Sequence, residues 1–307
     1  MKKKYFIGSL GTTAIDHFTC PNTTPAELVS NLRSTYEFNV GKNYVADPAI
    51  FRQIQQKVAE HVKITDLGGT AGNKLHALMH TLPQEMVAGA YFISPMSPAM
   101  QEKQHPLITT LSPDICEDMK FPTSITLPSG KDKLAIVHQG NVSALFSEEW
   151  IHTAVQAMFE KLPAKEEVED VFVFEASLCR KIGANDPAQA AYNILESVKK
   201  NNFKIVFGLE TKQKRAQDRP QDYIKLIECL DQGDLIIANL DELHALLKTQ
   251  NLAPHAAMRQ LQQLANGATI VMSDGTEPTL YLDHNGHPGA VPGFTFDPDC
   301  FQSTTGA

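Results

Sequence analysis

The chain is 307 residues long, 42% of its residues are hydrophobic, and its formal net charge is −8 at pH 7. This length and hydrophobic content are sufficient for one large domain or two modest domains with buried cores. The acidic balance argues against nucleic acids and membrane surfaces as partners, because both attract positive charge. The five cysteines lie far apart without a CxxC pair, so neither a disulfide framework nor a zinc site is indicated. We expect a cytoplasmic protein whose partner is a small molecule or another protein.

The N-terminal third is predicted to begin with a strand over residues 5–10, which leads into Gly11. Asp16 follows a few residues later, and strand ends are where α/β proteins hold ligands. Asp16 is therefore a candidate for orienting a substrate hydroxyl, with a turn-forming or capping role as the simpler alternative. Helices are predicted over residues 25–36 and 48–62.

A glycine turn followed by a helix occupies residues 66–82. Gly68 and Gly69 can adopt positive φ and leave the backbone accessible to a ligand. The apolar face of the helix comprises Leu75, Leu78, Met79 and Leu82, and its polar side comprises Asn73, His76 and His80. The free N–H groups at such a helix N-terminus suit an anionic or hydroxyl-rich ligand, although an ordinary turn is the alternative. The histidine pair lacks a nearby third ligand and is expected to lie on the surface.

The second half of the chain alternates apolar strands with amphipathic helices. Strands are predicted at 171–174, 204–208, 234–239 and 268–272, and helices at 148–159, 187–200, 220–230 and within 241–265. This alternation is typical of a doubly wound α/β fold, in which helices cover both faces of a mostly parallel sheet. A β-hairpin is predicted over residues 123–137, and no element is predicted within 95–113.

Three further motifs stand at the ends of predicted strands or of the chain. Asn239 and Glu242 belong to the sequence NLDE, where a carboxylate can hold Mg²⁺ and an amide can orient a phosphate. The same spacing also forms a helix capping box, which is the simpler alternative. Gly275 lies in a turn after a strand, and the stretch 303–307, STTGA, can point successive N–H groups at an oxyanion.

These motifs, taken in order, resemble those of the ribokinase-like (PfkB) carbohydrate and nucleoside kinases. The motifs are GxxxxD, GGTAGN, NLDE, VMSDG and STTGA. The form GGTxGNxxH at residues 68–76 looks most like the inosine–guanosine kinase branch. The resemblance implies one ribokinase-like α/β domain over residues 1–307, with a small β lid from about 12–45 and 95–140. It also implies the use of ATP and Mg²⁺, and a possible homodimer through the lid.

The resemblance assigns roles to particular residues. The sugar hydroxyls would be bound by Asp16, Gly68, Gly69 and Asn73; the nucleotide would be bound near Asn239, Gly275 and Thr305; Glu242 would hold the metal; and Gly306 and Ala307 would begin the anion hole. The family signature continues beyond this point with Gly-Asp, the Asp being the general base, so the chain is expected to be C-terminally incomplete.

The leading prediction is a kinase that phosphorylates the primary 5′-hydroxyl of a purine nucleoside, with inosine or guanosine ahead of adenosine. A sugar kinase or an adenosine kinase of the same family is the alternative. A non-catalytic ligand-binding protein on the kinase fold is the third reading, expected if the chain truly ends at Ala307.

Overall fold

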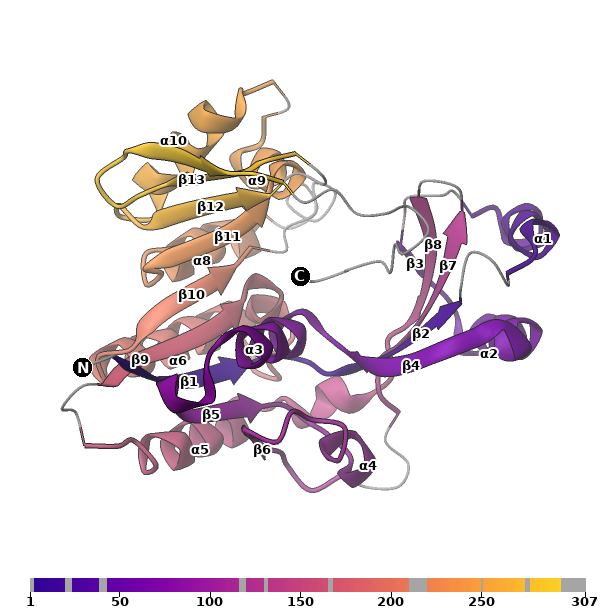
Figure 1. Cartoon of the computed structure of the whole chain (residues 1–307), viewed down its shortest axis with the longest axis horizontal. Helices are drawn as coiled ribbons and strands as arrows, with labels where there is room; N and C mark the ends of the chain where they lie inside the picture. The colour runs from indigo at the N-terminus through magenta and orange to yellow at the C-terminus, as the bar shows by residue number, and fades with distance from the viewer. Residues whose placement is uncertain are drawn as a thin grey trace.

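The computed structural model of the chain describes residues 3–19, 24–38, 43–115, 120–129, 132–164, 168–209, 220–249, 251–273 and 277–293. Its strands form one sheet of nine strands and one of five. The two sheets stand side by side in Figure 1, the larger on the left.

The nine-stranded sheet is mostly parallel. Its spatial order is β14 (Pro288–Val291), β13 (Thr279–Leu282), β12 (Thr269–Ser273), β11 (Leu235–Asn239), β10 (Lys204–Gly208), β9 (Val168–Glu175), β1 (Lys4–Leu10), β5 (Val87–Ile93) and β6 (Ile108–Leu111). All pairs from β12 to β6 are parallel, and β13 and β14 form an antiparallel hairpin at one edge. The chain first builds outward from β1 to β5 and β6, and then continues on the other side of β1 with β9. This reversal is the topological switch point at which such sheets bind ligands, outside the carboxyl ends of the strands.

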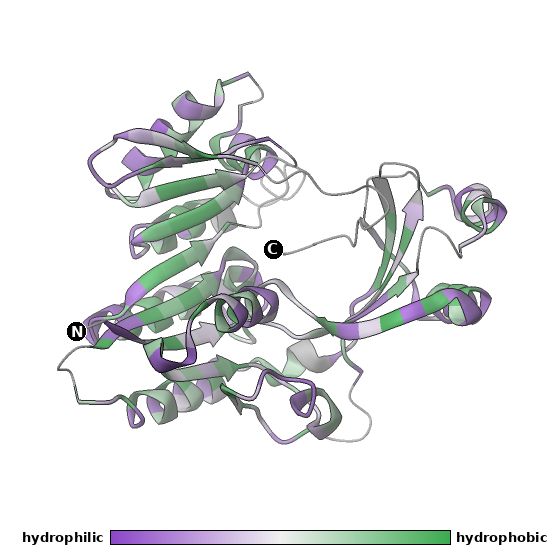
Figure 2. Ribbon diagram, in the orientation of Figure 1, coloured by the Kyte–Doolittle hydropathy of each residue, from purple (hydrophilic) through white to green (hydrophobic). Residues whose placement is uncertain are grey.

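Helices cover both faces of this sheet because alternate strand residues are buried on opposite sides. Phe6 of β1 packs in the larger core cluster, whereas its neighbour Ile7 packs in a separate one. The larger cluster takes residues from α5 (Glu148–Phe159), α6 (Pro187–Lys200), α8 (Pro220–Leu230), α9 (Leu240–Leu247) and α10 (Pro254–Leu264). The other takes residues from α3 (Thr70–Thr81) and α4 (Pro98–Gln101). Figure 2 shows the central strands of the large sheet as mainly hydrophobic and the helices as mixed. The predicted doubly wound α/β fold is thus confirmed.

The five-stranded sheet has a core of its own. Its order is β3 (Asn43–Val45), β8 (Asp132–His138), β7 (Thr123–Ser129), β2 (Ala14–Thr19) and β4 (Val62–Gly68). Residues of α1 (Ala26–Tyr36) and α2 (Pro48–Val58) pack with β7 and β8 in a third cluster that includes Leu32, Ile54 and Ile125. Residues 11–13 join β1 to β2, and Gly69 joins β4 to α3, so the chain passes between the two sheets at both places. Short 3-10 turns complete the described elements: η1 (Ala59–His61), η2 (Gln84–Met86), η3 (Val142–Leu145) and η4 (Ala176–Arg180).

The structure corrects the predicted elements at two places. The helix expected over 48–62 ends at Val58, and Val62 already begins β4 of the five-stranded sheet. The stretch 95–113, for which no element was predicted, contains α4 and β6, and β6 pairs with β5 in the large sheet. The hairpin over 123–137 and the alternating elements of the second half are confirmed. Within the described residues, no helix is long and apolar enough to cross a membrane.

Candidate functional site

The carboxyl ends of β1 and β9 meet the N-terminus of α3 at the switch point. Gly11, which follows β1, is buried and donates its N–H to the carbonyl of Ile93 at 3.2 Å. A Cβ at position 11 would collide with the side chain of Ala71 on α3 and would lie 3.7 Å from Oε2 of Glu175. Gly11 therefore allows the helix, the strand end and a carboxylate to approach one another closely.

Asp16 lies against the glycine turn. It projects from β2, and a Cβ at Gly68 of the paired strand β4 would collide with its carboxylate. The hydroxyl of Ser124 on β7 donates to Oδ1 of Asp16 at 2.5 Å. Three strands of the five-stranded sheet thus fix one half-buried carboxylate beside the turn that leads into α3. A carboxylate held in this way is a strong acceptor for the hydroxyl groups of a polyol.

Gly69 is required by both its backbone conformation and its surroundings. Its φ is +101°, and a Cβ at this position would collide with the carbonyl oxygen of Thr12. The carbonyl of Gly69 accepts the N–H of Asn73 at 2.9 Å, which starts the hydrogen-bond ladder of α3. The preceding N–H groups have no acceptor within the helix, so the N-terminus of α3 offers donors to a ligand. Asn73 is half-buried in this first turn.

Glu175 is a candidate that the sequence analysis missed. It ends β9, is only 1% exposed, and lies at the carboxyl end of the sheet beside Gly11. Carboxylates are rarely this buried without a specific role. The signal was present in the sequence, because an acidic residue directly after the apolar run VFVF resembles the polar residue that ends β11. Glu175 therefore joins Asp16 as a second carboxylate at the switch point.

His17 sets part of the local electrostatics. Burial lowers the pKa of its imidazole, and the nearby Lys103 ammonium lowers it further, while the Asp16 carboxylate acts in the opposite direction. Nδ1 of His17 lies 2.9 Å from Oγ1 of Thr65 on β4. The shift favours the neutral imidazole, so His17 adds little positive charge near Asp16 at neutral pH.

Asn239 and Glu242 lie together at the end of β11, where they form a capping box. The side chain of Asn239 accepts the N–H of Glu242 at 2.8 Å, and Oε2 of Glu242 accepts the N–H of Asn239 at 2.9 Å. The simpler alternative from the sequence is therefore present. Both residues nevertheless stand at the carboxyl end of the sheet, two strands away from Glu175.

Glu242 is the residue predicted to hold Mg²⁺. Mg²⁺ in nucleotide sites keeps several waters and uses one or two carboxylates together with substrate phosphates. No group of three or more His, Cys, Asp or Glu side chains that could hold a metal ion is found in the described ranges. Gly275, Thr305, Gly306 and Ala307, the remaining predicted site residues, lie outside the described residues.

Other features of the sequence have structural roles. Nε2–H of His76 donates to Oε1 of Gln104 at 2.6 Å, and His80 packs edge-on against His105. Cys179 and Cys229 are buried free thiols, and a hydrogen bond with Cys229 together with burial raises the pKa of Cys179 well above its usual range.

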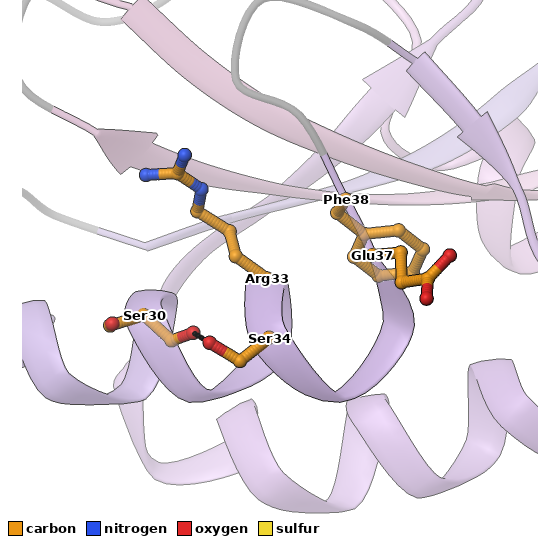
Figure 3. A pocket seen from close by; sticks show the side chains of 5 residues that line it. All are labelled: Ser30, Arg33, Ser34, Glu37 and Phe38. Atoms are coloured by element: carbon orange, nitrogen blue, oxygen red, sulfur yellow. Dashed lines mark hydrogen bonds between the residues drawn. The ribbon is translucent and has the colours of Figure 1, made fainter.

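A shallow depression of about 560 Å³ lies at the C-terminal end of α1 (Figure 3). It is lined by Ser30, Arg33, Ser34, Glu37 and Phe38. None of the predicted site residues lines it, so it is separate from the site at the switch point.

No protein-family model and no curated protein matches the chain. Solved structures do match its fold. Adenosine kinase from Schistosoma mansoni in complex with 2-fluoroadenosine is 15% identical with a TM-score of 0.75, and the match covers 100% of this chain and 86% of that one. Adenosine kinase from Anopheles gambiae in complex with a di(adenosine) tetraphosphate is 13% identical with a TM-score of 0.74, covering 98% and 85%. A PfkB protein from Polaromonas sp. JS666 is 12% identical with a TM-score of 0.55, covering 94% and 83%. These similarities confirm the predicted ribokinase-like fold.

Proposed function

We propose that this protein is an ATP-dependent kinase that transfers the γ-phosphoryl group to the 5′-hydroxyl of a purine nucleoside. The observation that carries the proposal is the half-buried Asp16 carboxylate, fixed by Ser124 and placed against Gly68 at the start of α3. This is an acceptor site for vicinal hydroxyls beside a set of free N–H donors. The similarity in fold to adenosine kinases supports a nucleoside as the bearer of those hydroxyls.

Different residues of the site would bind the phosphoryl acceptor and the phosphoryl donor. Asp16, Gly69 and Asn73 would hold the ribose and so place its 5′-hydroxyl at the carboxyl end of β9. Such positioning is a large part of catalysis in phosphoryl transfer, because the enzyme forms no covalent bond to the phosphoryl group. Glu242 and Asn239 would lie at the phosphates of ATP, where bound Mg²⁺ neutralises negative charge. The strand ends between these two groups form the path between donor and acceptor.

Among purine nucleosides, we propose inosine or guanosine ahead of adenosine. The support is the GGTxGNxxH form of residues 68–76, which covers the glycine turn beside Asp16 and the first turns of α3. The homodimer predicted through the small sheet stays a proposal as well.

A substrate panel tests the proposed function. ATP consumption by the purified protein should be stimulated by inosine, guanosine or adenosine and not by free ribose, fructose or 2′,3′-dideoxynucleosides. The dideoxy compounds are the matched controls because they keep the 5′-hydroxyl and remove the groups that Asp16 would bind. Stimulation by sugars alone would overturn the nucleoside assignment, and equal use of dideoxynucleosides would overturn the role of Asp16.

A further inference from the structure

Lys74 has an unusual position for a helix lysine. It follows Asn73 near the N-terminus of α3, is half-buried, and extends to the neighbouring strand β10. A Cβ at Gly208, the last residue of β10, would collide with Nζ of Lys74 and would lie 3.8 Å from the carbonyl oxygen of Phe174. The ammonium group therefore sits directly on the carboxyl end of β10.

The sheet order places this ammonium between the two halves of the site. β10 lies between β9 and β11, and Gly208 pairs in register with Glu175 on one side and Ile237 on the other. Neighbouring strands are about 4.8 Å apart, so β9 and β11 are separated by roughly 10 Å at this edge. The proposed acceptor hydroxyl would lie on the β9 side and the proposed ATP phosphates on the β11 side. A phosphoryl group transferred from one to the other passes β10.

The charge of Lys74 has no partner in the described part of the chain. No ion pair and no hydrogen bond involves its ammonium there, in contrast to Lys199, whose ammonium pairs with Asp234 at 2.6 Å. An ammonium group at this position can therefore pair with an anionic ligand. Phosphate oxygens are the natural counter-charge for a lysine, which acts on them as a compact point charge.

We propose that Lys74 binds the oxygens of the transferred phosphoryl group. In the transfer, the bond from the γ-phosphorus to the bridging oxygen breaks, and its electrons remain on ADP. The 5′-oxygen forms the new bond to the γ-phosphorus and loses its proton to the surrounding water, and Lys74 takes no part in this proton transfer. This inference rests on the proposed function and adds to it a cation that neutralises charge midway between donor and acceptor.

Three variants test the proposal. Lys74→Met removes the charge, and Lys74→Arg keeps it. Gly208→Ala keeps the lysine but displaces its flexible end, because the new methyl group occupies the position of Nζ. The matched control is Lys200→Met, which removes an equal charge from an exposed position at the C-terminus of α6. This position lies near the amino end of β10, whereas Lys74 lies at its carboxyl end. Circular dichroism melting should show that all four variants remain folded.

The readout is calorimetric binding of adenosine, inosine, their 5′-monophosphates and tripolyphosphate. The monophosphate carries a phosphoryl group where the transferred one arrives. We expect Lys74→Met to weaken monophosphate and tripolyphosphate binding at least tenfold and nucleoside binding less than twofold. Gly208→Ala should weaken monophosphate binding severalfold, Lys74→Arg less, and Lys200→Met should change nothing. In the ATP assay, Lys74→Met should lower kcat about 100-fold, the magnitude typical of one lost electrostatic contact in the transition state.

The outcomes separate this inference from the proposed function. Equal loss of nucleoside and monophosphate binding, or no loss of either, would overturn the role of Lys74 and leave the nucleoside site standing. Lys74-dependent binding of tripolyphosphate without nucleoside binding would overturn the nucleoside acceptor and support the phosphate role of Lys74. A protein that binds none of these probes would overturn both.

Discussion

The two ends of the site differ in how their polar residues are held. At the proposed acceptor end, Asp16 is fixed by contacts with Gly68 and Ser124, which come from other strands of the five-stranded sheet. At the proposed donor end, Asn239 and Glu242 bind each other within a single helix turn. The first arrangement requires the tertiary fold, whereas the second is complete in local structure.

This difference changes how strongly each end supports a function. A helix cap accounts for the hydrogen bonds between Asn239 and Glu242 without any ligand, and caps of this kind stabilise many helices. No local motif accounts for the Asp16 carboxylate on β2, which contacts Gly68 at the end of β4. The acceptor end therefore carries the stronger argument, and the donor end needs an experiment that separates capping from metal binding.

The largest effect is expected for Asp16→Ala. Removal of the carboxylate should lower kcat/KM for a nucleoside about 10²–10³-fold, since the substrate hydroxyls would lose a charged hydrogen-bond acceptor. Steady-state kinetics measure the loss. The matched control is Asp66→Ala, an exposed carboxylate directly opposite Asp16 in the same strand pair, which should change kcat/KM less than threefold. Similar losses of kcat/KM in both variants would show that the reaction depends on the total negative charge of this strand pair and not on the position of Asp16.

Asp234→Ala should have a smaller effect, confined to stability. Oδ2 of Asp234 accepts hydrogen bonds from the ammonium of Lys199 at 2.6 Å and from the N–H of Ile205 at 2.8 Å. Asp234 directly precedes β11, so these contacts lie at the amino ends of the strands of the large sheet. Loss of this carboxylate removes the acceptor on Asp234 for the N–H of Ile205 and for the Lys199 ammonium. We expect the free energy of unfolding, measured in urea, to fall by about 1–3 kcal/mol. The kcat/KM of the folded protein should not change. An activity loss like that of Asp16→Ala would mean that structural damage alone mimics a site mutation.

Most of the fold followed from periodicity, because long apolar strands and amphipathic helices such as α5 and α6 have strong local patterns. The errors occur where the local pattern was weak or misleading. β6 is a short strand in a region rich in proline and serine, and only its pairing with β5 defines it. Ile50 fits the apolar side of a predicted helix, yet it remains 36% exposed because Phe51, Ile54 and Val58 fill the contact.

The glycine turn and the start of α3 were predictable for a related reason. Gly68, Gly69 and Asn73 occupy one short segment whose turn and helix signals reinforce each other. Glu175 was missed although it directly follows a predicted strand, and Lys74 was missed because a lysine on a helix is ordinary in sequence. The position of Lys74 beside Gly208 depends on which strand lies beside which, and the order β11-β10-β9-β1 reveals it.

Glu242→Gln separates the two roles at the donor end. Glutamine can replace glutamate in a capping box, so the free energy of unfolding should change by less than about 0.5 kcal/mol. If Glu242 holds Mg²⁺ through water, loss of its charge should raise the Mg²⁺ concentration needed for half-maximal activity about tenfold, which corresponds to about 1.4 kcal/mol. Glu242→Ala should show this effect and also lose about 0.5–2 kcal/mol of stability, because it removes the cap. An unchanged Mg²⁺ dependence in Glu242→Gln would leave capping as the role of Glu242.

The smallest effect is expected from the protonation of His17, which lies next to Asp16. Burial and Lys103 lower the pKa of His17 despite Asp16, so the unfolded chain binds this proton more readily than the folded one. The stability contributed by neutral His17 is complete above pH 6.5 and decreases as the pH falls below that value toward the lower pKa of the folded state. Because the side chain is about half exposed, we expect less than about 1 kcal/mol between pH 7.5 and 5.5. Urea unfolding of His17→Gln is the control, since glutamine keeps a polar group near Thr65 without titrating. If both proteins lose the same stability over this range, another group is responsible for the pH dependence, and protonation of His17 does not contribute to it.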